Sequence, residues 1–251
     1  MQLFHYSLCR REAAEWMIDM NKIIEGLKDG LIVSCQARPG NPLRGASHMA
    51  AMAKAAELGG AVGIRADGVD DITAIKELTD LPIIGIYKTE PSPVFPYITP
   101  EFKHAEILAG LGVEIIAVDA TLRERTDGKT AAELIRRIKG ELGVPVMADI
   151  ATLEEGIRAA EAGADIVATT LSGYTTYTEF TPGPDLELVR RVHSSVDVPV
   201  IAEGRYLTPE HLVVGYRAGA HAIVVGKIIT NVTFITKRFI DEVNRIRREE
   251  A

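Results

Sequence analysis

The sequence predicts an α/β protein built as a single (β/α)8 barrel, and three observations lead to that expectation. Short apolar runs rich in β-branched residues recur along the 251-residue chain, as expected for strands buried on both faces. Each run precedes a segment with helical spacing of apolar residues, and this alternation favours a parallel sheet with right-handed crossovers. The strand–helix unit occurs about eight times at a spacing of roughly 25 to 30 residues, which fits a closed TIM barrel. An open doubly wound sheet is the alternative, but no glycine-rich dinucleotide fingerprint follows the first strand.

Ahead of the barrel, the chain carries a segment with an apolar stripe. Apolar residues at helical spacing predict an extra N-terminal helix from about Arg10 to Asp29, which stops at Gly30. We therefore divide the chain into an N-terminal extension and helix, 1–29, and a barrel domain, 30–251. Met20 is a second candidate translation start, which makes residues 1–19 a candidate dispensable extension.

The elements of the barrel then follow in regular order. Thr152 to Glu155 forms a predicted capping box, and Thr208 is a predicted N-cap with proline at the first helical position. Thr99, also followed by proline, predicts a helix start in the same way. The expected strands are 31–35, 61–65, 81–87, 114–118, 144–148, 165–170, 198–202 and 222–226. The expected helices cover about 48–58, 70–78, 99–109 and 129–138 and begin near 152, 185, 208 and 231.

Composition places the chain among ordinary globular proteins and excludes several functional classes. Hydrophobic residues make up 47% of the chain and charged residues 25%, with a net charge of −7. The negative charge argues against nucleic acid or an anionic membrane as a partner. The two cysteines form no disulfide framework, and no His/Cys cluster has metal-ligand spacing, so we expect neither a metal nor a cofactor. No long apolar run or secretory signal is present, and we expect a cytoplasmic protein.

Polar residues stand where the predicted strands end. In a closed barrel these positions share one mouth, and burying so many polar groups there without a ligand would be costly. The strand-end residues are Gln36, Arg65, Lys88, Asp119, Asp149, Thr170, Glu203 and Gly226. A local pairing, such as Arg65 with Asp67 or Glu203 with Arg205, is the alternative for any one of them. The set as a whole predicts an active site.

The last two strand ends combine small residues with cations. Gly204 and Arg205 follow one strand, and Gly226 and Lys227 follow the next. Phosphate sites in such barrels are often formed at these loops, where backbone N–H groups face the anion. We therefore expect a phosphorylated small-molecule substrate.

Lys88 and Glu203 end the third and seventh strands, which lie opposite one another in a ring of eight. An amine and a carboxylate on two sides of a substrate suit the removal of a proton from one face of a carbon and its return on the other. This chemistry is epimerisation next to a carbonyl group. The same lysine could form a Schiff base instead, as in an aldolase, and position alone leaves both open.

Six segments of the chain resemble the N-acylglucosamine-6-phosphate 2-epimerase family. They are 30–36, 82–88, 118–121, 147–149, 169–175 and 201–205. The strings Ser34-Cys35-Gln36 and Thr169 to Thr175 are not general features of barrels, and the likeness extends from about Met20 to the C-terminus. The resemblance implies a ribulose-phosphate-binding type of barrel. It also implies a metal-independent enzyme of sialic acid catabolism that interconverts N-acetylmannosamine 6-phosphate and N-acetylglucosamine 6-phosphate.

The resemblance assigns roles to individual residues. Lys88 and Glu203 match the acid/base pair, and Gln36, Arg65 and Asp149 match residues that hold the sugar and its amide. We add Asp119, Thr170 and Arg205 to the expected substrate-binding set, and assign the phosphate to Gly204, Gly226 and Lys227. One departure follows the last strand, where Asn231 replaces the arginine common in the family.

Two further expectations complete the sequence-based picture. A homodimer is expected from the apolar stripes on the two terminal helices. Besides the epimerase, the alternatives are another phosphate-binding-barrel isomerase, a Schiff-base aldolase using Lys88, and a non-catalytic sensor of sugar phosphates. Which of Lys88 and Glu203 acts as base, and whether one base serves both faces, stays open.

Overall fold

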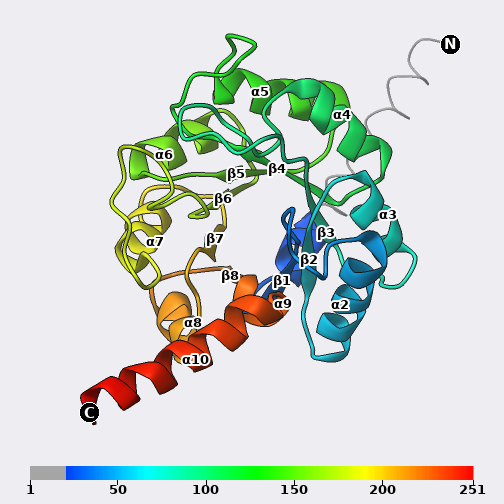
Figure 1. The fold of residues 1–251 in the computed structure, drawn as a ribbon. Helices are drawn as coiled ribbons and strands as arrows, with labels where there is room; N and C mark the ends of the chain where they lie inside the picture. Colours follow the sequence, from blue (N-terminus) through cyan, green and yellow to red (C-terminus); the bar gives the residue numbers. More distant parts are fainter. Residues whose placement is uncertain (1–20, 251) are drawn as a thin grey trace, which may run out of the picture.

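The computed structural model describes residues 21–250, and its strands close into a ring that helices surround (Figure 1). All neighbouring strands pair in parallel, and β8 returns to pair with β1, which confirms the predicted (β/α)8 barrel. The strands are β1 (Leu31–Cys35), β2 (Gly63–Asp67), β3 (Ile83–Ile86), β4 (Ile115–Asp119), β5 (Val146–Asp149), β6 (Ile166–Ala168), β7 (Val200–Glu203) and β8 (Ala222–Val225). The helices are α2 (Ala46–Leu58), α3 (Val69–Lys76), α4 (Phe102–Gly110), α5 (Ala131–Arg137), the π-helix η1 (Ile138–Leu142), α6 (Leu153–Glu161), α7 (Leu186–His193), α8 (Pro209–Arg217), α9 (Lys227–Thr230) and α10 (Val232–Glu249).

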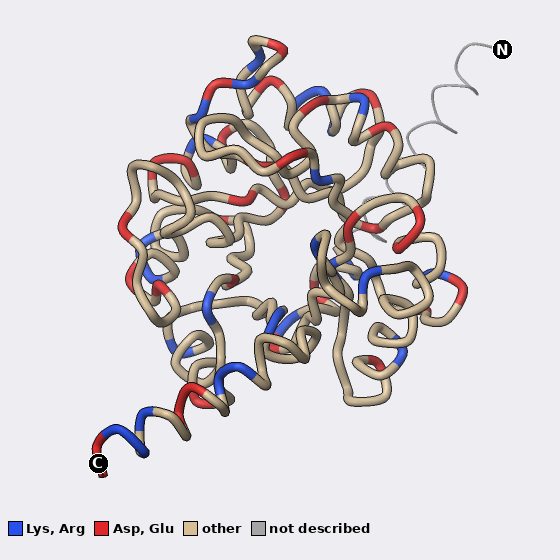
Figure 2. The backbone as a smooth tube through the Cα atoms, viewed as in Figure 1, with Lys and Arg blue, Asp and Glu red and all other residues tan. Residues whose placement is uncertain are grey.

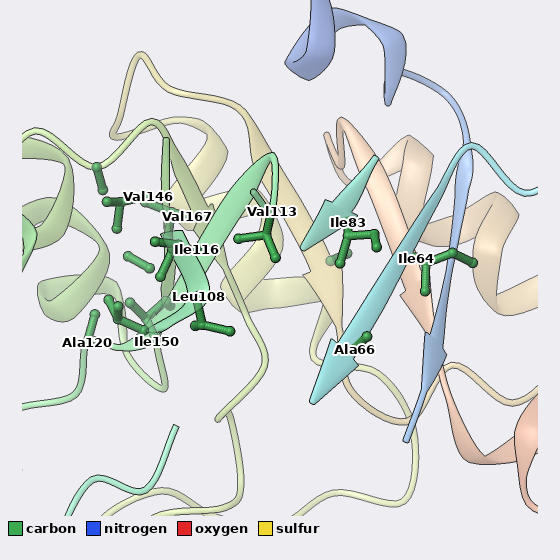
Figure 3. Packing of buried hydrophobic residues seen from close by; sticks show 14 of the residues in the cluster. Ile64, Ala66, Ile83, Leu108, Val113, Ile116, Ala120, Val146, Ile150 and Val167 are labelled. Atoms are coloured by element: carbon green, nitrogen blue, oxygen red, sulfur yellow. The ribbon is translucent and has the colours of Figure 1, made fainter. Parts of the chain in front are cut away.

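Alternate residues of each strand face the two sides of the barrel wall. One set, which includes Ile32, Ile84 and Met147, fills the interior of the ring. The intervening set packs against the helices, and Figure 3 shows Ile64, Ile83 and other members of this outer layer. Because the period is two, the interior set continues upward into the polar residues at the strand ends. The alternation that places apolar side chains in the barrel interior therefore also points the polar strand-end side chains toward the mouth of the barrel.

Residues 21–26 are helical and lie at the opposite end of the ring from the polar strand ends. Ile24 and Leu27 are buried with the interior residues of the barrel, so this segment closes its lower end. The Nε2 atom of His221 lies 2.8 Å from the carbonyl oxygen of Ile24, which fastens the segment to the loop before β8. The predicted helix start near Arg10 and the extension 1–19 lie outside the described residues.

Most predicted helix signals are confirmed. Thr152 and Glu155 form the expected capping box, and Thr208 caps α8 with Pro209 at its first position. Gly112, Gly163 and Gly219 all have positive φ just after a helix, as a terminating glycine requires. Each of these turns returns the chain to the start of the next strand.

The helix start predicted at Thr99 is wrong. Helix α4 begins at Phe102 and Glu101 is its N-cap residue, because Glu101 and His104 complete a capping box. Thr99 has a φ of 44°, outside the helical region, and its hydroxyl accepts a hydrogen bond from the backbone N–H of Tyr87 at 3.1 Å. The Thr-Pro pair thus ends the loop after β3 rather than opening the helix.

The last helix, α10, projects away from the barrel (Figure 1). None of its 18 residues is buried, and its exposed side chains include Phe239, Ile240, Val243 and Ile246. The four-residue α9, which precedes it, was not predicted, because four residues are too few to show a period. None of the helices within residues 21–250 has the length and apolar character needed to span a bilayer.

Candidate active site

A cavity of about 880 Å³ opens at the C-terminal ends of the strands. The predicted site residues that line it are Gln36, Arg65, Lys88, Thr170, Glu203, Gly204, Arg205, Gly226 and Lys227. Asp119 and Asp149 end β4 and β5 but are fully buried. Asp149 binds the cavity residue Arg65, whereas Asp119 binds Arg123, which is not part of the cavity lining. The mouth of the barrel therefore gathers residues that are far apart in the sequence.

Arg65 is the central charge of the site. It lies within β2, and its guanidinium donates to Asp149 at 3.0 and 2.6 Å and to Glu203 at 2.9 Å. The side chain is 1% exposed, so its charge needs these carboxylates as partners. The alternative pairing of Arg65 with Asp67 is not formed, because the ion pairs of Arg65 cross the ring to β5 and β7.

Glu203 faces the cavity at the end of β7. Its carboxylate also accepts a hydrogen bond from the hydroxyl of Thr170 at 3.2 Å, and Thr170 donates to Asp149 at 2.6 Å. Its backbone is joined to Thr169, whose hydroxyl accepts from the N–H of Glu203 and donates to its carbonyl, both at 3.1 Å. Burial raises the pKa of Glu203, and the positive charge of Arg65 opposes this effect. The carboxyl is thus held in one orientation and binds a proton more tightly than a solvated glutamate.

Lys88 lies two residues beyond β3 and reaches the same cavity. Its ammonium donates to the Gln36 side-chain oxygen, and the Gln36 amide donates to the Ser34 hydroxyl at 2.7 Å. Burial lowers the pKa of Lys88, as do the charges of Arg65 and Arg38, whereas Asp67 and Glu203 raise it. A lysine with a lowered pKa supplies more of the neutral amine that can accept a proton.

The proline-rich loop after β3 folds back on itself as a hairpin, which holds the backbone of Lys88 in place. Lys88 bridges Ile98 in antiparallel fashion, and Arg123 donates to the carbonyl oxygen of Ser92 at 3.1 Å. Arg123 is itself bound by Asp119 at 2.5 Å, and its guanidinium lies 5.7 Å from the ring centroid of Tyr97. Asp119 was predicted to bind substrate. In the structure its carboxylate contacts Arg123, which in turn holds the loop that carries Ser92.

Some cavity residues were missed by the sequence analysis. Tyr97 lines the cavity from the loop after β3, and a single aromatic residue in a proline-rich loop carries no signal of such a position. Ser34 also lines it, and here a signal existed, because alternation from the interior residue Ile32 leads directly to Ser34. Phe234 and Lys237 of α10 belong to the lining as well.

The lining of the cavity is rich in positive charge. Among its described lining residues, Glu203 is the one acidic side chain. The basic ones are Arg38, Arg65, Lys88, Arg205, Lys227 and Lys237. Figure 2 shows Lys and Arg positions on α9 and along α10. In a protein of net charge −7, this local excess of cations favours an anionic ligand.

Comparisons with known proteins place the chain in a family. A sequence model of the NanE family, described as "Putative N-acetylmannosamine-6-phosphate epimerase", matches residues 49–245. The chain belongs to the NanE family. A relative from Caldanaerobacter subterraneus subsp. tengcongensis with the corresponding 2-epimerase description is 49% identical over 219 residues, covering 87% of this chain and 92% of the relative. A Cutibacterium acnes relative with that description is 46% identical over 223 residues, with 88% and 96% covered.

Solved structures agree with this membership of the NanE family. The N-acetylmannosamine-6-phosphate 2-epimerase of Clostridium perfringens superposes with a TM-score of 0.84 at 46% identity, covering 87% of this chain and 95% of that one. A thiamine phosphate pyrophosphorylase from Pyrococcus furiosus has a TM-score of 0.57 at 16% identity, covers 84% of this chain and 91% of that one, and supports the fold alone.

Asp67 offers a test of the charges around Lys88. Its carboxylate accepts from the Lys88 backbone N–H at 2.9 Å and raises the pKa of the ammonium. Asp67→Asn keeps an acceptor oxygen but removes the charge, so the pKa of Lys88 falls further. If neutral Lys88 is the base, the rising limb of kcat/KM against pH should move to lower pH. Asp70→Asn on α3 is the matched control, and an unmoved limb in Asp67→Asn would contradict the electrostatic assignment.

Proposed function

We propose that this chain interconverts N-acetylmannosamine 6-phosphate and N-acetylglucosamine 6-phosphate by moving a proton at carbon 2. The observation that carries the proposal is the placement of Lys88 and Glu203. Lys88 lies two residues beyond β3 and Glu203 ends β7, on opposite sides of the ring, and both line one cavity. Membership of the NanE family supports the same chemistry. A role in sialic acid catabolism and a cytoplasmic location remain predictions of the sequence.

The reaction requires the open-chain aldose, in which carbon 2 lies next to the aldehyde. Neutral Lys88 takes the proton from carbon 2, and the electrons of the C–H bond move to the carbonyl oxygen to give an enolate. The positive charge of Arg65 at the cavity wall stabilises that negative charge. The opposite face of carbon 2 then receives a proton, from Glu203 in a two-group route or from Lys88 again if the intermediate turns. Either route inverts carbon 2 and consumes no cofactor.

Proton exchange with solvent tests the proposal. In D2O, the enzyme should convert N-acetylmannosamine 6-phosphate into the gluco epimer with deuterium at carbon 2, followed by NMR. Deuterium in recovered substrate would favour a single shared base, whereas its restriction to the product would favour two groups. A sensor of sugar phosphates would show no exchange. A Schiff-base aldolase would give a borohydride-trapped adduct at Lys88.

We assign the phosphate of the substrate to the loops after β7 and β8. Gly204, Gly226 and Lys227 line the cavity there, and the backbone N–H groups of Lys227 and Ile228 donate to no carbonyl in the described part of the chain. The ammonium of Lys227 lies 4.7 Å from the ring centroid of Phe234, which holds it at the cavity. Asn231, in place of the expected arginine, accepts a hydrogen bond from the N–H of Phe234 and caps α10.

Lys227→Ala should therefore weaken binding more than chemistry. Loss of one cation facing a phosphate should raise KM about tenfold while kcat stays within about twofold, as expected for uniform binding. Steady-state kinetics measure both values. The exposed Lys103 on α4 is a matched control for loss of an ammonium, and an unchanged KM in Lys227→Ala would remove the phosphate role.

We further propose a homodimer in which α10 supplies the interface. Phe239 is 71% exposed and Ile240 53% exposed, and α10 buries none of its residues within the described chain. Exposed apolar side chains at helical spacing, here Phe239, Ile240, Val243 and Ile246, are typical of a contact surface. The α10 helix of a second chain presents the same apolar side chains and could pack against this one in a symmetric dimer. Sedimentation equilibrium should give the mass of two chains, and a single-chain mass at micromolar concentration would contradict the proposal.

A further inference from the structure

The loop between β6 and α7 carries residues that shape the cavity. Thr170, Leu171 and Tyr174 line it, and the hydroxyl of Thr170 contacts both Asp149 and Glu203. The loop contains neither helix nor strand from residue 171 to 184. No ladder of backbone hydrogen bonds therefore runs along it, and it is held at separate points. The backbone N–H of Leu171 donates to the carbonyl oxygen of Ile150 at 3.0 Å, and the hydroxyls of Ser172 and Tyr177 donate to Asp185 at 2.6 Å and to Glu155 at 2.5 Å.

Arg205, at the neighbouring strand end, contacts this loop at three further points. Its Nη1 donates to the carbonyl oxygen of Ser172 at 2.6 Å, its Nε to that of Gly183 at 2.7 Å, and its Nη2 to the Thr181 hydroxyl at 3.4 Å. The contacts reach both ends of the loop. Arg205 is 6% exposed, and all three of its guanidinium nitrogens donate to the loop. Three of the five N–H donors of the guanidinium are thus taken by the loop.

The local backbone is shaped for this contact. Gly204 has a φ of 111° and Arg205 itself a φ of 60°, an uncommon conformation for a non-glycine residue that persists only where surrounding contacts fix it. On the other side, Gly173 has a φ of 76°, and a Cβ there would lie 3.1 Å from the Arg205 Nη1. The same Cβ would also lie 3.1 Å from the carbonyl oxygen of Glu179 and from the Cα of Phe180, so glycine at position 173 leaves space for the loop backbone as well as for the guanidinium.

Two aromatic rings complete the enclosure of Arg205. The guanidinium carbon lies 5.4 Å from the ring centroid of Tyr174 and 5.3 Å from that of Phe180. These rings belong to the same loop and pack edge to face with centroids 6.2 Å apart. The β6–α7 loop is therefore folded around the side chain of Arg205, which belongs to the segment after β7.

We propose that Arg205 is a positioning residue, and not a ligand of the substrate phosphate. It locks the β6–α7 loop so that Thr170 stays against Asp149 and Glu203, next to the residue that we assign to proton transfer. The proposal rests on the proposed function for its kinetic consequence alone. Its structural consequence, an ordered loop, can be measured whether or not the chain is an epimerase.

Two variants test this role from opposite sides of the contact. Arg205→Lys keeps the charge but cannot make three spread donor contacts, and it carries the test of the role of Arg205. Gly173→Ala keeps Arg205 but obstructs its Nη1 and also strains the loop backbone at a positive φ, so it shows the effect of a displaced loop on catalysis. Both should raise hydrogen exchange of peptides covering 171–184 by about tenfold or more, with exchange in β4 unchanged. Both should lower kcat about tenfold, because a displaced Thr170 misorients Glu203. The dissociation constant of inorganic phosphate, from NMR titration, should stay within about twofold of the wild type.

Other results would overturn the proposal. A phosphate ligand at Arg205 predicts that Arg205→Lys weakens phosphate binding about tenfold while exchange of the loop stays as in the wild type. Unchanged exchange of the loop in Arg205→Lys would by itself contradict the proposal. Thermal unfolding shows whether each variant is folded, and Phe180→Leu, at a ring that is 60% exposed, gives a milder third test with a smaller rise in loop exchange. Arg190→Lys on the exposed side of α7 is the control for an arginine exchange.

Discussion

Lys88→Ala should abolish nearly all turnover while leaving the protein folded. Removing the amine takes away the group assigned to accept the carbon 2 proton, and general acid–base groups typically contribute about 10² to 10⁴-fold to a rate. We expect kcat to fall by about 10³-fold or more, with substrate binding changed far less. Formation of the gluco epimer and loss of the carbon 2 proton signal in D2O measure the effect directly.

The control for this experiment is Lys103→Ala, which removes an exposed ammonium on α4 far from the cavity. It should leave kcat unchanged. Turnover near the wild-type rate in Lys88→Ala would mean that Glu203 alone moves the proton, and the assignment of Lys88 would be wrong. Because Lys88 also contacts Gln36, a thermal unfolding curve should accompany the kinetics.

Arg65→Ala should cause the largest loss of stability of any single change at the site. The substitution leaves the fully buried Asp149 and the partly buried Glu203 without their shared cation, and breaking a buried ion pair such as Arg65–Asp149 costs about 3 to 5 kcal/mol. Activity should fall as well, since the enolate loses its neighbouring positive charge. Chemical denaturation measures the free energy of unfolding, with Arg158→Ala, at an exposed ion pair on α6, as control.

The stability deficit of Arg65→Ala should depend on pH in a defined direction. The pKa of Glu203 is already raised by burial and is lowered by Arg65, so it rises further in the variant. A carboxyl whose pKa is higher in the folded than in the unfolded chain makes the folded state lose stability as the pH rises above the unfolded value. The deficit should thus be larger at pH 8 than at pH 5.5. Asp149→Asn in the same background should restore part of the loss, and a deficit that is flat with pH and unaffected by Asp149→Asn would point to packing instead.

The fold could be predicted from the sequence because each strand–helix unit repeats one local pattern. Buried runs such as 198–202 and caps such as Thr152 and Thr208 act over a few residues, and the closed ring follows from their number. Thr99 shows the limit of this reasoning. The same Thr-Pro pair that caps α8 ends a loop before α4, because Glu101 and His104 form a competing capping box.

The sequence could predict which strand-end residues form the site, but not which of them form hydrogen bonds and ion pairs with one another. The sequence placed Arg65 and Glu203 at one mouth, yet suggested local partners for both. In the structure their charges meet across the ring, and such pairing depends on barrel closure rather than on spacing along the chain. Arg205 illustrates the same point, since its carbonyl partners at Ser172 and Gly183 come from a loop whose path no motif specifies.

The residue at position 231 affects both the stability of α10 and the charge beside Lys227, and one side chain cannot serve both. As the N-cap of α10 it stabilises the helix by about 1 kcal/mol, which an arginine there would forfeit. An arginine would instead bring a second permanent cation beside Lys227. With asparagine at this position, α10 keeps its N-cap, and Lys227 stays the one cation that we assign to the phosphate. Among homologues, those with arginine at the position of Asn231 should bind the phosphate more tightly and have a less stable start of α10, and those with asparagine should show the reverse.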